Sequence, residues 1–139
     1  MIVKAFQTYL ESKTAVTNLV GTRIYPRHLP RDNTTYPVLT HQLISNNHLH
    51  VIGSAAGQST ARVQVDCWGL KLADVETLAE AVRGILQGYS GKMGTVDVGF
   101  VMLVNDMDMH ESPKDASEQW LYRRVMDFTV KYGESVPTF

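Results

Sequence analysis

The feature that most constrains the fold is an alternation of residues from Val125 to Tyr132, within a strand that is predicted over Trp120–Tyr132. A period of two residues is that of a β-strand that buries one face and exposes the other. A second alternation of this kind runs from Thr60 to Trp68. The apolar members of the two alternations are Ala61, Val63, Val65, Cys67, Met126, Phe128, Val130 and Tyr132. The chain is therefore expected to form a sheet with one apolar face, which another layer has to cover.

Two parts of the chain have the spacing of helices that can form this layer. Residues 2–20 predict two short helical pieces, because Ser12-Lys13 interrupts the apolar pattern and Thr14 can cap the second piece. A clearer helix follows Asp74, which can cap its start, and Gly88 can end it. The residues expected on the buried faces are Val3, Phe6 and Leu10 in the first piece and Val75, Leu78, Val82, Ile85 and Leu86 in the later helix.

The remaining segments predict further strands and their connections. Val38–Ser45 and Thr95–Met109 are expected as strands. Residues 46–59 are rich in turn-forming residues at both ends and small in the middle, and they are expected to form the long, mobile tip of a hairpin. The residues expected on one face of the later strand are Val96, Val98, Phe100, Met102 and Val104. The other connections are a connector with three prolines (21–37), a helix stop and turn (88–94), a polar loop (111–119) and a flexible tail (133–139).

The order of these elements predicts a single α+β domain that spans residues 1–139. Strands joined by hairpins pair antiparallel, and the helices before and between them have to cover one face of the sheet. We expect an antiparallel sheet of about four to five strands, helices packed on one face and an extended hairpin loop.

Composition limits the classes of function. The chain has 139 residues and a net charge of −1 with no block of like charge, whereas nucleic-acid binders usually carry a basic stripe. The one cysteine excludes an intrachain disulfide and suits a reducing compartment. The first residues lack the apolar core and cleavage site of a signal peptide, and no apolar run approaches the ~20 residues of a membrane span. We therefore expect no membrane partner.

Two patterns suggest chemistry at first sight. His48 and His50 lie on one side of an extended segment, and Asp66 can pair with them across the hairpin. A metal site needs three or four ligands on a rigid frame, so exposed polar histidines are the favoured interpretation. Cys67 has no basic neighbour and lies on the apolar face of its strand, which predicts a buried, inert thiol.

Three further patterns have ordinary structural interpretations. Asp106 and Asp108 lie where a strand runs into a polar loop, so they are expected to be solvated acids. Arg123 and Arg124 are expected to point to opposite faces of a strand. The glycine-rich residues 88–94 lack the spacing of a phosphate-binding loop. Nothing combines a nucleophile, a base and an oxyanion donor, so we expect no catalysis, no cofactor and no metal.

The order of the segments resembles one known family. The pieces are a short N-terminal helix that ends in LVGTRIYP, then LP, YPVLTHQLIS, the strand ARVQVDCWG, the helix LADVETLAEAVRGIL and the closing strand LYRRVMDFTVKYG. With this order and spacing, most of the chain resembles the tail-completion proteins of long-tailed bacteriophages, also called tail terminators or tail-to-head joining proteins. The resemblance includes no catalytic motif, so no functional residue is carried over individually.

The resemblance implies a structural virion protein and not an enzyme. Such proteins form a ring, commonly of six subunits, on the last layer of the tail tube protein. The ring ends the growth of the tube and presents its other side to the head connector or stopper protein, while DNA passes through it without sequence-specific binding. The chain is then expected at the head-proximal end of the tail in the virion, and in the host cytoplasm during assembly.

Two exposed segments are candidates for contacts in such an assembly. The prolines of the connector fix φ and stiffen the segment, so it loses less conformational entropy when it docks on a partner. The alternative is that the connector only crosses the surface between the helix layer and the sheet. In the hairpin tip, a purely solvated loop has no need of three aliphatic residues. The candidate contact residues are Arg27, His28 and Arg31 in the connector and Leu49, Val51 and Ile52 in the tip.

Two other functions stay open at this point. One is a head-closure protein in the neck of the same virion. The other is a small metal-dependent hydrolase or ligand-binding protein that uses the histidines.

Overall fold

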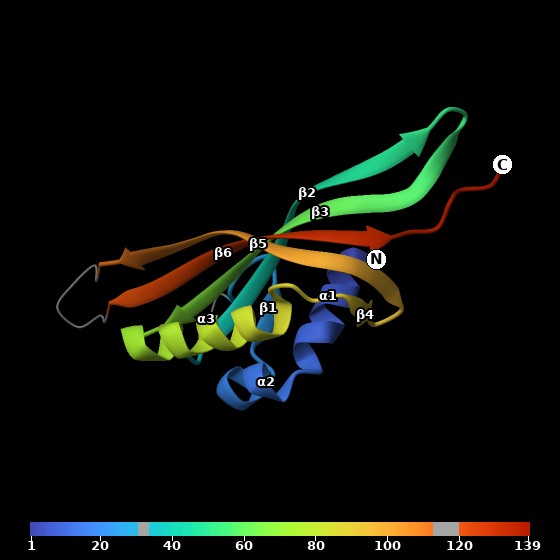
Figure 1. Ribbon diagram of the computed structural model, residues 1–139. Helices are drawn as coiled ribbons and strands as arrows, with labels where there is room; N and C mark the ends of the chain where they lie inside the picture. Colours follow the sequence, from blue (N-terminus) through green and yellow to red (C-terminus); the bar gives the residue numbers. More distant parts are fainter. Residues whose placement is uncertain (31–33, 113–119) are drawn as a thin grey trace.

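The structure is a computed structural model that describes residues 1–30, 34–112 and 120–139. Over these residues a curved six-stranded sheet forms one layer, and three helices cover one of its faces (Figure 1). The strand order across the sheet is β1-β2-β3-β6-β5-β4. The elements are α1 (Ile2–Glu11), α2 (Thr14–Val20), β1 (Ile24–Pro26), β2 (Val38–Val51), β3 (Ser54–Gly69), α3 (Leu72–Leu86), β4 (Gly91–Met93), β5 (Val96–Glu111) and β6 (Leu121–Gly133).

The predicted α+β class is confirmed, and the predicted number of strands is corrected to six. The two additional strands are short. The connector supplies β1, which pairs with β2 in parallel, and the glycine-rich link supplies β4, which pairs with β5. The connector also contains a cis peptide bond between Tyr36 and Pro37. All other pairings are antiparallel.

The pairing of β3 with β6 forms the centre of the sheet. Val63 lies opposite Phe128 and Val65 opposite Met126 in an antiparallel ladder. The two predicted alternations are confirmed, because their apolar members are all buried on the side of the helices. These residues are Ala61, Val63, Val65, Cys67, Met126, Phe128, Val130 and Tyr132.

The helices bury nearly the faces that were predicted. Phe6 and Leu10 of α1 are buried, whereas Val3 is 36% exposed because the buried face of α1 turns towards Ile2 and Tyr9. In α3 four of the five predicted residues are buried and Ile85 is partly buried against the core. The buried residues of α3 are Val75, Leu78, Ala79, Val82 and Leu86.

The predicted helix caps are wrong in detail. Thr14 and Asp74 lie inside the first turns of α2 and α3, and the residues before those helices are Lys13 and Lys71 without side-chain caps. Asp74 still stabilises the first turn of α3, because its negative charge interacts favourably with the positive end of the helix dipole. None of the helices in the described part of the chain is long and apolar enough to cross a membrane.

The predicted facing of β5 is right at its start and wrong further on. Val96 and Val98 are buried as predicted. A bulge between Val98 and Phe100 then adds one residue, so that Phe100 turns outward and Val101 takes the buried position. The exposed apolar residues in this part of β5 are Phe100, Met102 and Val104.

The predicted long loop over residues 46–59 is also wrong. β2 continues to Val51, β3 begins at Ser54, and the turn between them contains only Ile52 and Gly53. Gly53 has a φ of 82°, the positive value that tight hairpin turns favour. Between His48 and His50 the pairing is irregular: His48 lies opposite Ser59 and His50 opposite Ala55, so β3 has three residues here where β2 has one. The predicted polar loop 111–119 lies mostly outside the described residues, and residues 134–139 have no regular secondary structure.

Phe128 tests the packing of the core. Its side chain is fully buried at the centre of β6, opposite Val63 and Leu103. Phe128→Ala removes the ring and leaves a cavity, so the free energy of unfolding should fall by about 3–5 kcal/mol. Lys131→Ala, on the exposed face of the same strand, is the control and should change it by less than ~0.5 kcal/mol. Denaturant unfolding measures both, and a loss below ~1 kcal/mol for Phe128→Ala would contradict the assigned packing.

His41 makes the stability depend on pH. The ring lies in the core beside Phe6, contacts the Gln7 side chain, and is 2% exposed. Burial lowers the pKa of His41 from 6.5 to about 4, although Glu11 acts in the opposite direction. Between these two pH values the unfolded chain binds the proton and the folded chain does not. The folded state should therefore lose up to about 3 kcal/mol as the pH falls from 6.5 to 4.

Two measurements check this expectation. Denaturant unfolding at pH 7 and pH 4 gives the loss, and His41→Gln, which cannot titrate, should lose less over the same interval. NMR of the ring protons follows the titration of His41 directly and does not depend on the variant folding. A midpoint near 6.5 for His41 would contradict the buried, neutral ring.

Candidate assembly surface

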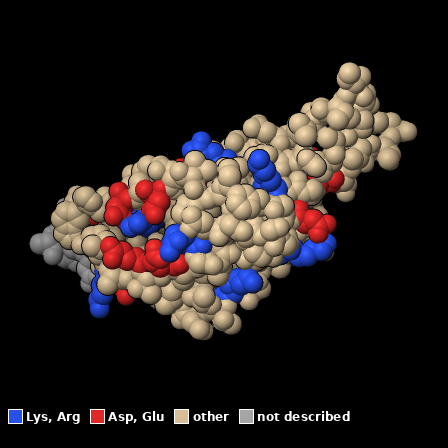
Figure 2. Space-filling model, in the orientation of Figure 1, with Lys and Arg blue, Asp and Glu red and all other residues tan. Residues whose placement is uncertain are grey.

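The hairpin of β2 and β3 extends beyond the rest of the molecule. β3 pairs with β6 only as far as Gln58, opposite Gly133, and beyond Gly57, which accepts a hydrogen bond from Glu134, the two strands continue without β6 to the turn. We call residues 49–58 the arm. It projects away from the part of the sheet that the helices cover (Figure 1). The arm contains no Lys, Arg, Asp or Glu, whereas Figure 2 shows charged side chains over the rest of the same face.

The arm presents aliphatic side chains to solvent. Leu49 is 55% exposed, Val51 58% and Ile52 106%. These are the three contact residues predicted for the hairpin tip, and the structure brings them together at the end of the arm. Exposed aliphatic side chains on a projecting hairpin have little to pack against within the same subunit, so the arm fits a contact surface better than a solvated loop.

The contact residues predicted for the connector lie elsewhere. Arg27 and His28 are exposed just after β1, and the backbone N–H of Arg27 donates to the carbonyl of His41 at 2.7 Å. Arg27 has a φ of 74°, a region that residues other than glycine rarely occupy. His41 precedes Val51 by ten residues on β2, which corresponds to about 30 Å. The structure therefore does not join the two predicted groups, and Arg31 lies outside the described residues.

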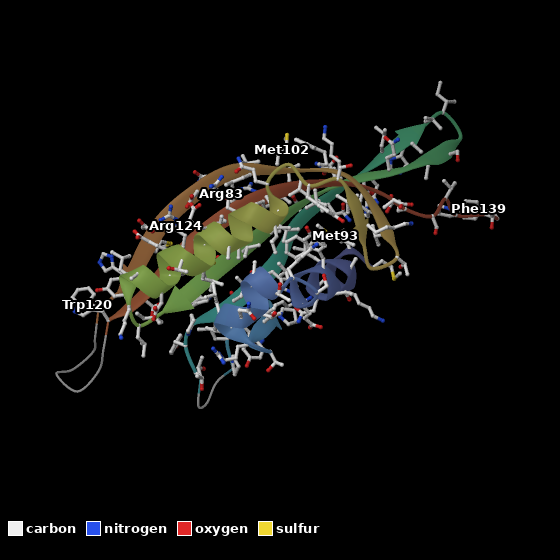
Figure 3. The ribbon with its side chains drawn as sticks, turned by 60° about the horizontal axis from the view of Figure 1, so that its bottom comes forward. Arg83, Met93, Met102, Trp120, Arg124 and Phe139 are labelled. Carbon is white, nitrogen blue, oxygen red and sulfur yellow. The ribbon has the colours of Figure 1, made fainter. Side chains whose placement is uncertain are left out.

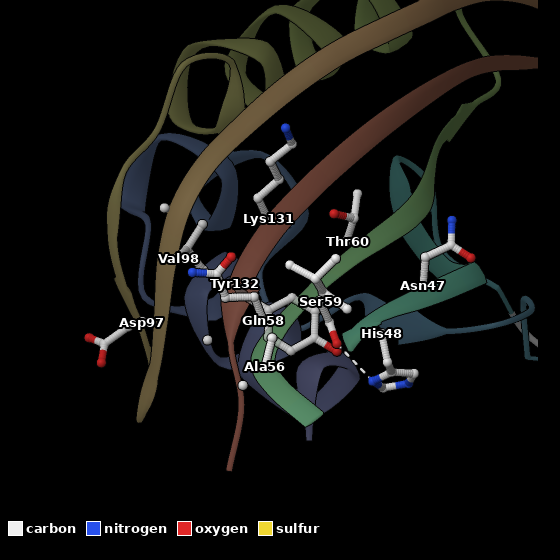
Figure 4. Close-up of a pocket in the computed structure, with 14 residues that line it drawn as sticks. Asn47, His48, Ala56, Gln58, Ser59, Thr60, Asp97, Val98, Lys131 and Tyr132 are labelled. Atoms are coloured by element: carbon white, nitrogen blue, oxygen red, sulfur yellow. Dashed lines mark hydrogen bonds between the residues drawn. The ribbon is translucent and has the colours of Figure 1, made fainter. Parts of the chain in front are cut away.

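A hydrogen-bonded cluster that was not predicted holds the base of the arm. Ser59 donates to Glu134 at 2.6 Å, and Nδ1 of His48 lies 2.7 Å from both Ser59 Oγ and Glu134 Oε1 (Figure 4 draws the His48–Ser59 bond). The bonds from Ser59 and then His48 lower the pKa of Glu134. The backbone N–H of Glu134 also donates to Gly57. The cluster therefore ties the segment after β6 to the arm.

This cluster does not have the geometry of a hydrolase. In a Ser–His–acid triad, the serine and the acid contact different nitrogens of the imidazole, so that the ring can pass a proton. Here Ser59 and Glu134 both contact Nδ1 of His48. The arrangement fixes the arm but does not activate the serine.

The histidines do not form the metal site that the sequence left open. Asp66 lies opposite Thr40 and pairs with Arg123 at 2.8 Å, so it is not near His48, which lies opposite Ser59. Among the residues that the structure describes, no group of three or more His, Cys, Asp or Glu side chains is arranged to hold a metal ion.

The other candidate residues have structural environments. Cys67 is fully buried, and burial raises the pKa of its thiol far above the ordinary value. Arg123 and Arg124 lie on opposite faces as predicted: the first pairs with Asp66 and the second with an acidic pair. That pair, Asp106 and Asp108, is therefore not merely solvated, because Arg124 bridges the two carboxylates. Figure 3 shows Arg124 beside α3.

An open hollow of about 700 Å³ lies at the base of the arm (Figure 4). Residues from β2, β3, β5 and β6 line it, among them Asn47, Thr60 and Lys131. Its mixed polar and apolar lining suits the side chains of a protein partner as well as water. No sequence signal indicated this hollow, because it depends on how four separated segments curve together.

Comparison with known proteins identifies the family. The family model described as "Tail completion protein gp17" matches residues 4–132. No curated protein matches the chain. Among solved structures, a chain in the virion of a native gene transfer agent particle aligns with a TM-score of 0.72 and 14% identity, over 93% of this chain and 91% of that chain. At this identity the likeness establishes the fold alone. The family match covers nearly the whole chain, and the chain therefore belongs to the tail completion protein gp17 family.

Proposed function

We propose that this chain forms a ring, with six as the expected number of subunits, at the head-proximal end of a phage tail. The ring caps the tail tube, ends its growth and joins it to the head connector. The family makes the chain a structural protein of a phage-like virion tail and not an enzyme. The solved chain with the same fold comes from a phage-like particle, which supports the proposal.

The arm is the observation that carries the proposal. It is uncharged, it projects beyond the helix-covered part of the sheet, and Leu49, Val51 and Ile52 at its end are exposed. Burying an aliphatic side chain fully stabilises a contact by up to about 1.5–3 kcal/mol. The arm therefore gains from docking on a neighbouring subunit, the tail tube or the connector, while the core of its own subunit does not use it.

The charge of the chain agrees with a channel that DNA passes through. The net charge is −1, and on the face shown in Figure 2 Lys and Arg side chains are interspersed with Asp and Glu. Phosphate contacts from Lys and Arg dominate the affinity of proteins for DNA. A ring without a basic stripe should let DNA move without holding it.

Particles that lack the protein test the function. If the chain caps the tube, its loss should leave tails of abnormal length that are not attached to heads. Loss of a head-closure protein should instead leave free tails of normal length and heads that leak DNA. Electron microscopy of particles made without the gene, with the gene supplied in trans as the control, distinguishes the two. Tails of normal length would contradict the capping function.

A shortened arm tests the contact surface. Replacing Leu49–Gln58 by Asn-Gly keeps His48 opposite Ser59 and closes the hairpin with a favoured two-residue turn. The fold should survive, because no residue of the arm belongs to the buried core. The melting temperature should stay within a few degrees, whereas the joining of tails to heads should be lost.

A matched variant separates the length of the arm from its apolar end. Replacing Leu49, Val51 and Ile52 by Thr keeps the length and the β-propensity of the strands while removing aliphatic surface. Counting joined particles by electron microscopy after complementation measures both variants. If both join tails as well as the original chain, the arm is not a contact surface.

A further inference from the structure

The two long outer strands of the sheet each have a free edge. The pairing of β2 with β1 ends at His41, and no described segment lies along β2 from residue 42 to residue 51 on that side. The pairing of β5 with β4 ends at Val98, and Val101 still exchanges backbone hydrogen bonds with Gly88 and Tyr89. Beyond it, no described segment lies along residues 102–111. We call these two stretches the free edges of β2 and β5.

Free edges of this length are normally protected. An exposed edge offers unpaired N–H and C=O groups to another chain, and proteins commonly block it with lysine or proline. Residues 42–51 and 102–111 contain neither lysine nor proline, and only the second stretch carries charged side chains, those of Asp106, Asp108 and Glu111. The first stretch contains two irregularities of the ladder and the second contains one; each interrupts the ladder but does not prevent pairing on either side of it. The two stretches are equal in length and are left open at opposite margins of one sheet.

The outer strands also carry much of the exposed apolar surface. Half of the large apolar side chains that are exposed in the described chain lie on β2 and β5, although these strands make up a much smaller share of the residues. On β5 the bulge at Gly99 shifts the register, and several of these apolar side chains therefore point outward. These residues are Ile44, Leu49, Val51, Phe100, Met102, Val104, Met107 and Met109.

The direction of the strands fits pairing between copies. β2, β3, β6 and β5 are neighbours in this order and each pair is antiparallel, so β2 and β5 run in opposite directions. When a second copy continues the sheet, its β2 lies beside β5 of the first copy in the antiparallel sense. Each copy then uses one edge on each side, which is the head-to-tail contact that a ring requires.

Charge selects this contact over symmetric pairing of like edges. The free edge of β5 carries Asp106, Asp108 and Glu111 and no Lys or Arg; Arg124 of β6 bridges the first two, and the group keeps a net negative charge. The free edge of β2 carries no acidic residue and contains His48 and His50. Pairing two copies of β5 would bring carboxylates opposite carboxylates, which is unfavourable across strands. Pairing β5 with β2 brings no like charges together.

We propose that the free edge of β5 in one subunit pairs with the free edge of β2 in the next, so that the sheets continue from copy to copy around the ring. This inference rests on the ring of the proposed function and names the surface that closes it. The free edge of β2 includes residues 49–51 of the arm, whereas the turn at Ile52 and Gly53 lies beyond this edge and stays available to another protein of the tail.

Disulfide cross-linking in assembled particles tests the pairing. Asn47 of β2 and Asn105 of β5 are both exposed and both lie on the face of the sheet without helices. Asn47→Cys is combined with Asn105→Cys, and in further variants with Cys at 102, 107 or 109 to allow for the register. The native Cys67 is fully buried and does not interfere. Oxidation should convert most of the chain into a ladder of multimers on non-reducing gels.

Three controls make the result specific. Asn47→Cys with Glu76→Cys, which lies on the exposed side of α3, should give no ladder. Each single variant, Asn47→Cys and Asn105→Cys, should stay monomeric, and efficient dimers from either one would indicate symmetric edges and overturn the proposal. Electron microscopy of the same particles shows whether a ring is present. A ring without a ladder from any pair overturns the edge pairing alone, whereas tails without a ring overturn the proposed function as well.

Discussion

The ladder between β3 and β6 is the interaction on which the rest of the structure depends. It pairs two strands that are both apolar on one side, so it creates a surface that three helices must cover. It also fixes the positions of β2 and β5, which pair with these two strands and have no other long partner among the described residues. The free edges, the arm and the cluster at its base all take their places from this central pair.

The other face of the central pair is polar and largely satisfied. Arg123 pairs with Asp66 and lies 4.7 Å from the centre of the Trp68 ring, and Arg62 pairs with Asp127. Burial raises the pKa of Asp66 although Arg123 acts against this, which shows how closely the carboxylate is packed. A face of this kind leaves few groups free to bind a partner. Contacts with other copies are therefore better served by the margins of the sheet, where apolar side chains and backbone groups remain open.

The sequence predicts the buried parts of this fold well and the exposed parts poorly, for a physical reason. In β3 and β6 one face is buried, so apolar side chains recur at every second residue. Both strands were therefore predicted. In the arm both faces are exposed, no alternation is needed, and the small residues Ser54-Ala55-Ala56 looked like a loop. In β5 a bulge at Gly99 shifts the facing, and a bulge leaves no clear signal in composition. The aliphatic residues of the tip could be named as contact candidates, because a solvated loop has no need of them. The His48–Glu134 contact could not be inferred, because the two residues lie far apart in the sequence.

The arm has a consequence for how such proteins can diverge. No residue of the arm belongs to the core, so insertions and deletions there change its length without disturbing the packing of the domain. Side chains alternate between the two faces of a paired strand, so a change that preserves the outward-facing residues has to add or remove two residues in each strand. Each such step changes the reach of the arm by about 7 Å. Relatives that fit tails and heads of different dimensions can therefore share one domain and differ by discrete steps in the length of a single hairpin.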